Sequence, residues 1–172
     1  MDTTYRAPAD IRIGHVHLKV ADIDRAVAFY RDILGFDLLV NMGSAAFLSA
    51  GGYHHHVGLN TWESRGGQPP APGTTGLYHF ALNYPTRRDL AIALKHLIDA
   101  GWPIDGASDH TTHEAIYLRD PDGNGIELAC DRAAAVWRPL YEAAARDPSH
   151  FRALNKPLDF DGLMREAGGS VA

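Results

Sequence analysis

The sequence of 172 residues contains a single cysteine, Cys130, and no long hydrophobic run. One cysteine cannot form an internal disulfide, so the fold does not depend on a covalent crosslink. A membrane-spanning helix needs about 20 consecutive apolar residues, and no stretch of the chain provides them. The first residues, MDTTYRAPAD, lack the basic and then apolar pattern of a secretory signal. These absences favour a reducing, cytoplasmic setting and no membrane partner.

Basic residues are also few, and they are scattered. Sixteen lysines and arginines face 21 aspartates and glutamates, which gives a net charge of -5. Nucleic-acid binding requires clustered basic side chains, so a nucleic-acid partner is not expected. Histidine, by contrast, occurs ten times. Because histidine is the commonest metal ligand and a frequent proton-transfer group, histidines are the first candidates for a functional site.

One order of elements occurs twice along the chain. Residues 13–20 alternate like a half-covered strand, and a helix is predicted from Asp22 to Gly35. After a proline- and glycine-rich loop at 64–76, a strand at 77–84 and a helix from Thr86 to Gly101 repeat this order. Six further short strands are predicted at 36–42, 45–50, 54–62, 104–108, 114–119 and 124–130. The repeated unit of strand, helix and three strands is the main indication of the architecture.

Strand alternation places a polar set of side chains on one face of the predicted sheets. The set consists of His15, His17, His54, His56, Gly58, Asn60, His79, Ala81, Asn83, Gly125, Glu127 and Ala129. In this pattern His55 points to the opposite face, so the triplet at 54–56 is not expected to form one three-ligand cluster. A face this polar is better explained by a cavity lined with ligands than by a packed core.

His15, His79 and Glu127 offer two imidazoles and one carboxylate. This set suits a divalent first-row metal with coordination positions left open for substrate. The alternative is that both histidines are ordinary hydrogen-bonded strand residues and that Glu127 is solvated. His15 and His79 hold matching positions in the two repeats, and this symmetry favours the metal site.

Three segments, IGHVHLKVADIDRAVAFYRDILGF, GLYHFAL and YLRDPDGNGIEL, resemble the vicinal oxygen chelate superfamily of glyoxalases, bleomycin resistance proteins and extradiol dioxygenases. The similarity covers residues 13–132 and is closest to catechol 2,3-dioxygenase-like proteins. It implies an α+β fold in which two βαβββ modules pair into a cup-shaped mixed sheet around a metal site. The expected domain is 1–132, with modules at about 11–63 and 76–132. A C-terminal helical extension at 133–172 would cover a sheet face, a partner subunit or the mouth of a pocket.

The resemblance implies that the metal ligands are His15, His79 and Glu127. His17 is the competitor for the first position if the strand register differs. The implied metal is Fe(II), with Mn(II), Zn(II) and Ni(II) as alternatives. The resemblance to glyoxalase-type isomerases implies a site with four protein ligands. The position of the fourth ligand, a second carboxylate, corresponds to Gly58 in this sequence. A missing fourth ligand favours dioxygen chemistry over isomerisation, although glycine there also permits close approach of a neighbour.

Catalytic roles follow from the same resemblance. His56 is the expected acid-base group, with His55 as the alternative if a bulge shifts the strand. Tyr117, ten residues before Glu127, is expected to hydrogen-bond a substrate or ligand oxygen. His110, or else His113, is expected to assist bound dioxygen.

The implied function is extradiol-type ring cleavage of a catechol-like dihydroxyaromatic in aromatic catabolism, with dioxygen as co-substrate. The alternatives are a glyoxalase-type isomerase, a thiol transferase, or a non-catalytic small-molecule-binding or resistance protein. Retention of the His15, His79 and Glu127 set disfavours the non-catalytic alternative. A homo-oligomer, most simply a dimer, is also expected from the resemblance.

Overall fold

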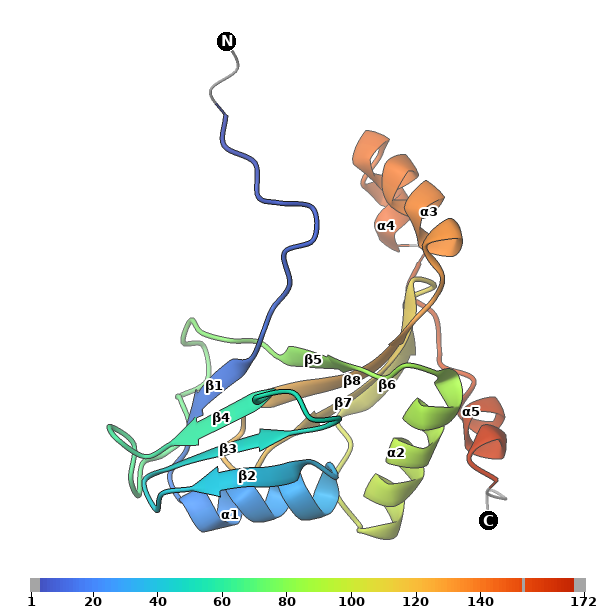
Figure 1. Ribbon diagram of the computed structural model, residues 1–172. Coiled ribbons are helices and arrows are strands. Elements are labelled where there is room, and N and C mark those ends of the chain that lie inside the picture. Colours follow the sequence, from blue (N-terminus) through green and yellow to red (C-terminus); the bar gives the residue numbers. More distant parts are fainter. Residues whose placement is uncertain (1–3, 153, 169–172) are drawn as a thin grey trace.

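The computed structural model describes residues 4–152 and 154–168 (Figure 1). Residues 1–3 of the predicted domain, and residues 153 and 169–172 of the predicted extension, lie outside the described part. The first repeat contains β1 (Val16–Lys19), α1 (Ile23–Ala28), the π-helical turn η1 (Phe29–Ile33), β2 (Asp37–Asn41), β3 (Ala45–Ser49) and β4 (Val57–Asn60). The second contains β5 (Phe80–Asn83), α2 (Arg87–Asp99), β6 (Gly106–Asp109), β7 (His113–Arg119) and β8 (Gly125–Asp131). Three helices follow: α3 (Ala134–Arg146), α4 (Ser149–Arg152) and α5 (Phe160–Glu166).

Each repeat forms one four-stranded mixed sheet. The strand orders are β1-β4-β3-β2 and β5-β8-β7-β6, so the same topology occurs twice. In each sheet the first strand pairs in parallel with the last, and the other pairs are antiparallel. The predicted α+β class and the two βαβββ units are therefore confirmed.

Local chemistry explains where the two main helices begin and end. The Asp22 carboxylate accepts a hydrogen bond from the backbone of Arg25 at 2.9 Å, and the Thr86 hydroxyl accepts one from Asp89 at 3.1 Å. Both are N-caps of the expected type. The φ angles of Gly35 and Gly101 are 78° and 65°, a left-handed conformation that favours glycine after a helix.

The core lies between the helices and the apolar faces of the sheets. Leu90, Leu94 and Leu97 of α2 are fully buried, and α5 adds Leu163 beside them. The opposite sheet faces carry Phe47, His17, Tyr117 and other polar or aromatic groups. This division leaves one face of each sheet available for a site.

Two carboxylates of the turn between β7 and β8 tie the repeats together. Asp120 accepts a hydrogen bond from the Tyr30 hydroxyl at 3.1 Å. Asp122 accepts hydrogen bonds from the Ala21 backbone at 3.0 Å and from Arg25 at 2.7 Å. Burial, and secondarily the charge of Asp120, raises the pKa of Tyr30 well above its usual value, so the hydroxyl stays a donor at neutral pH. The turn therefore fixes α1 against the second repeat.

The helices α3 and α4 project beyond the end of the second sheet (Figure 1). The prediction of a helix through Pro139 is confirmed, and no side chain of α3 is fully buried. Among the described helices, none has both the length and the apolarity to span a bilayer.

Candidate metal centre

Glu127 of β8 is the centre of the site. The residue is 6% exposed, and both carboxylate oxygens contact imidazoles. The Nε2 atom of His79 lies 2.8 Å from Oε2, and the Nε2 atom of His113 lies 2.8 Å from Oε1. The structure therefore brings His79 and Glu127 together, and His113 contacts the remaining oxygen; that His79 and Glu127 ligate a metal stays a prediction.

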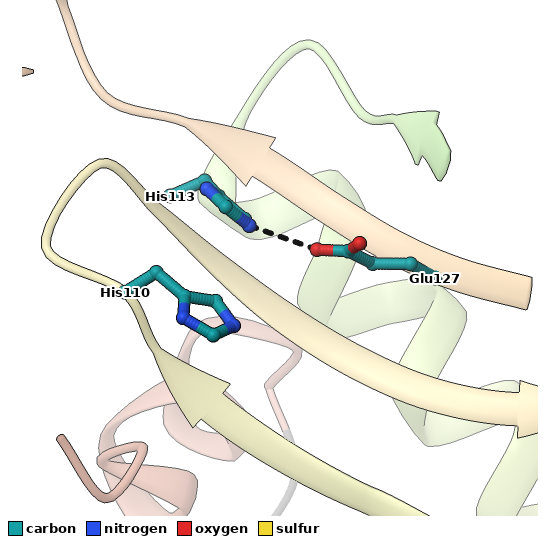
Figure 2. A group of neighbouring side chains, drawn as sticks. All are labelled: His110, His113 and Glu127. Carbon is teal, nitrogen blue, oxygen red and sulfur yellow. Dashed lines mark hydrogen bonds and ion pairs between the residues drawn. The ribbon is translucent and has the colours of Figure 1, made fainter. Parts of the chain in front are cut away.

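Two further side chains adjoin this group. His110 Nε2 and the Tyr117 hydroxyl share a hydrogen bond of 2.5 Å, and the His110 and His113 ring centroids are 4.8 Å apart. Figure 2 shows His113 directed at the Glu127 carboxylate, with His110 beside them. One ligand atom from each of His110, His113 and Glu127 lies within 4.8 Å of the others, so these three side chains could hold a metal ion.

The protonation states suit cation binding. Burial alone would raise the pKa of Glu127, but the hydrogen bond from His113 and the nearby histidine charges lower it overall. Burial, followed by the charge of His113, lowers the pKa of His110. Burial, followed by the charge of Glu127, raises the pKa of Tyr117 to about 12. At neutral pH the site therefore presents an ionised carboxylate, a neutral His110 and a protonated phenol.

The turn that carries the two additional histidines is strained. Thr111, between His110 and His113, has φ 65° and is the one described non-glycine residue with positive φ. Its backbone donates to Asp109 Oδ1 at 2.7 Å, and its hydroxyl donates to the Leu154 carbonyl at 2.9 Å. Backbone strain of this kind persists only where surrounding contacts hold it. Here those contacts come partly from the C-terminal extension.

His15 lies apart from the Glu127 group. It is exposed and directly precedes β1. Its ring centroid is 4.3 Å from that of His55 and 6.3 Å from that of His54. The structure thus brings His79 and Glu127 together and leaves His15 in a separate cluster of imidazoles. The assignment of His15 as a metal ligand stays a prediction.

Strand alternation does not extend through residues 54–56, because β4 begins at Val57. The expectation that His55 points away from the Gly58 face is therefore wrong. The His55 ring lies 5.0 Å from that of Phe47, and Phe47 pairs with Gly58 on the same face.

His56 is also separate from the Glu127 group. Its Nδ1 accepts a hydrogen bond from the Ala50 backbone at 3.3 Å. The side chain lines a different cavity of about 760 Å³, together with Phe36, Tyr84 and residues of α2. Its acid-base role stays a prediction.

Glycines shape both halves of the site. A Cβ at Gly58 would lie 3.0 Å from the His17 ring, so the corner without a fourth ligand is occupied by His17. This contact agrees with the expectation that glycine there permits close approach. A Cβ at Gly125 would lie 2.2 Å from the Tyr78 carbonyl oxygen and 3.0 Å from the Cβ of His79. Gly125 therefore lets the backbone that carries His79 approach β8.

The sequence pattern predicts no separate role for Gly125 and indicates His113 only as an alternative to His110. The signal for Gly125 was its place on the polar strand face, two residues before Glu127. No comparable signal existed for His113, because its contact with Glu127 depends on how β7 lies against β8.

The two βαβββ units of equal topology define the class of fold. Residues 12–128 match the family described as "Glyoxalase/Bleomycin resistance protein/Dioxygenase superfamily". The chain belongs to this superfamily.

Individual relatives agree with this membership. The chain is 37% identical over 159 residues to "Catechol-2,3-dioxygenase" of Bacillus subtilis (strain 168), which covers 92% of this chain and 53% of that protein. It is 32% identical over 123 residues to "Biphenyl-2,3-diol 1,2-dioxygenase 3" of Rhodococcus globerulus, with coverage of 72% and 65%. The chain thus spans about half to two thirds of these relatives. A glyoxalase/dioxygenase structure from Nostoc punctiforme has a TM-score of 0.60 at 24% identity, covering 76% and 98% of the two chains, and supports the fold alone.

Proposed function

We propose that this protein is a metal-dependent dioxygenase that cleaves the ring of a catechol-like dihydroxyaromatic beside its two hydroxyl groups. The proposal is supported by the 37% identity to a catechol-2,3-dioxygenase. The single structural observation that carries it is the buried Glu127 carboxylate with an imidazole 2.8 Å from each oxygen. A buried carboxylate beside two imidazoles is a suitable set of ligands for a cation at Glu127.

The donor set fits a divalent first-row metal. Imidazole nitrogens and a carboxylate suit Fe(II), Mn(II), Zn(II) and Ni(II), and two histidines with one carboxylate are typical of non-haem Fe(II) oxygenases. The three side chains that this structure brings within reach of one ion are His110, His113 and Glu127. By resemblance we assign Fe(II) to His79, Glu127 and His15, of which His79 and Glu127 are in contact and His15 lies in the separate imidazole cluster. Iron bound there would supply a chelation site for both substrate oxygens and a binding site for dioxygen.

The surrounding side chains orient this set. His113 donates to or shares a proton with Glu127 Oε1 at 2.8 Å, which leaves Oε2 as the oxygen on the His79 side. Partners of this kind fix a ligand's orientation and tune its basicity. His113 therefore favours a carboxylate that ligates through one oxygen and keeps other coordination positions open.

Proton handling is assigned to Tyr117, His110 and His56. Tyr117 is protonated at neutral pH and can donate a hydrogen bond to a substrate oxygen. Its hydroxyl is also hydrogen-bonded to His110, so a proton can pass between the phenol and this imidazole. By resemblance alone, His56 is proposed as the base for a substrate hydroxyl; in this structure its side chain lines the other cavity. Imidazole is the side chain that most often serves as a general acid or base in enzymes.

The test is iron-dependent oxygen uptake. Protein loaded anaerobically with Fe(II) is mixed with a series of substituted catechols in an oxygen electrode, with Glu127→Gln protein as the control. We expect equimolar loss of oxygen and catechol with the wild-type protein and none with Glu127→Gln. Absence of uptake with every catechol would refute ring cleavage. Formation of an adduct from a thiol and an electrophilic substrate, or isomerisation of a hemithioacetal, in its place would identify the transferase or the isomerase alternative.

A further inference from the structure

A second cavity, of about 350 Å³, lies directly against the candidate metal centre. One side is formed by the strained turn with His110, Thr112 and His113. The other side is formed by the C-terminal extension, through Tyr141 of α3, Phe151 of α4, and Leu154 and Asn155 after it. The extension therefore lines a pocket.

The extension is anchored to the turn by specific bonds. The backbones of Asp109 and Lys156 exchange two hydrogen bonds, of 2.9 and 2.8 Å. Arg132 Nη1 pairs with the Asp109 carboxylate at 2.5 Å, and Thr111 donates to the Leu154 carbonyl. These contacts hold residues 154–156 against the end of β6. The cavity walls are thus positioned relative to the two histidines.

The far wall is aromatic and lacks formal charge. The Tyr141 and Phe151 rings meet edge to face, with centroids 5.7 Å apart and an interplanar angle of 87°. Tyr141 and Phe151 are 48% and 53% exposed, so about half of each residue remains open to a ligand. A ligand ring can pack edge to face or offset against either of them, because ring edges and faces carry opposite partial charge.

The superfamily match ends at residue 128, so the helices that carry these rings lie beyond it. None of the lining side chains is a lysine, arginine, aspartate or glutamate. A ligand with a carboxylate on its ring would find no lysine or arginine partner in this lining, and burial of an unpaired charge is costly. The cavity size lies at the lower end of the usual range for small-molecule sites, about 300–1,000 Å³.

We propose that this cavity is the slot for the ring system of the substrate, that Tyr141 and Phe151 contact it, and that the preferred substrates are one- or two-ring diols with uncharged substituents. The proposal rests on the proposed function for the reaction itself. The slot's contribution to ligand binding does not depend on turnover.

The first experiment measures binding without turnover. The probe 2,3-dihydroxynaphthalene is titrated into metal-free protein and followed by its fluorescence. We expect saturable binding that weakens at least about tenfold in Tyr141→Ala and Phe151→Ala and is retained in Tyr141→Phe. Val136→Ala, an exposed apolar position of α3 outside the cavity, is the matched control and should bind like the wild type. Equal binding by all variants would overturn the slot.

The second experiment uses Fe(II)-loaded protein. With 2,3-dihydroxynaphthalene, Tyr141→Ala should raise KM about tenfold and leave kcat nearly unchanged. The wild type should have a higher kcat/KM for this diol than for 3,4-dihydroxybenzoate. A KM unchanged by Tyr141→Ala, or a preference for the carboxylated diol, would overturn the slot even if ring cleavage occurs. Binding in the first experiment without any oxygen uptake would instead refute the proposed function and leave the slot standing.

Discussion

Replacing Gly125 with alanine tests what places His79 beside Glu127. The new Cβ would lie 2.2 Å from the Tyr78 carbonyl oxygen, whereas Cβ contacts under 3.0 Å are essentially never observed. The backbone at residues 78 and 79 must therefore retreat by at least 0.8 Å, the difference between these distances. Backbone cannot rotate aside as a flexible side chain can, so the 2.8 Å contact between His79 and Glu127 should be lost.

The expected cost has two parts. Overpacking of this kind destabilises a fold by about 1–3 kcal/mol, which urea unfolding would measure. Displacement of a metal ligand or its partner lowers metal affinity by about 10–100-fold, which calorimetric titration with Mn(II) would measure. Gly106→Ala is the matched control, because a Cβ on that β6 glycine meets no atom within 4 Å. A folded Gly125→Ala protein with wild-type Mn(II) affinity would refute the assignment of His79.

Three further predictions concern the same region and the core. His113→Ala should weaken Mn(II) binding about 10–100-fold, and His113→Gln, whose amide can still donate to Glu127, should lose less; equal losses in a titration would contradict an orienting role. The hydrogen bond from Arg132, opposed by burial, lowers the pKa of Asp109. Its stabilisation is therefore present above the unfolded pKa of about 3.9 and lost as pH falls through the lower folded value. The stability difference between wild type and Asp109→Asn should shrink below about pH 4, and a difference independent of pH would exclude this origin. Leu94→Ala should cost about 2–5 kcal/mol in urea unfolding, since Leu94 is fully buried; a loss below about 1 kcal/mol would contradict its place in the core.

Features encoded by local chemistry were predictable from the sequence. The caps at Asp22 and Thr86 and the stops at Gly35 and Gly101 act within one turn of their helices. Hydrophobic alternation marks strands on the same scale. The repeated order of elements then defined the architecture.

Strand boundaries were less accurate where turns compete with alternation. The histidine triplet at 54–56 was expected within a strand but precedes it. Gly51 and Gly52 both have positive φ, at 63° and 78°, and pairing with β1 begins only at Val57. The positions of His55 and His56 are determined by this turn and by the register of the pairing between β4 and β1. Neither feature produces a periodic pattern in the sequence.

The site was predictable in part for a similar reason. The parallel pairing of Ala81 with Glu127 puts His79 on the same face as Glu127, as the repeat implied. His113 reaches Glu127 because Tyr117 pairs with Glu127 and His113 begins the same strand. That register, and the C-terminal rings near His110, are long-range features without a local sequence signal.

The most direct measurement is the iron content of protein reconstituted anaerobically with Fe(II) and freed of excess metal. Wild type, His79→Ala and His96→Ala would be compared, because His96 is a partly exposed α2 histidine that contacts the Asp32 carbonyl, away from Glu127. We expect stoichiometric iron in the wild type and in His96→Ala, and almost none in His79→Ala. Full iron retention by His79→Ala would contradict a metal centre built on His79 and Glu127.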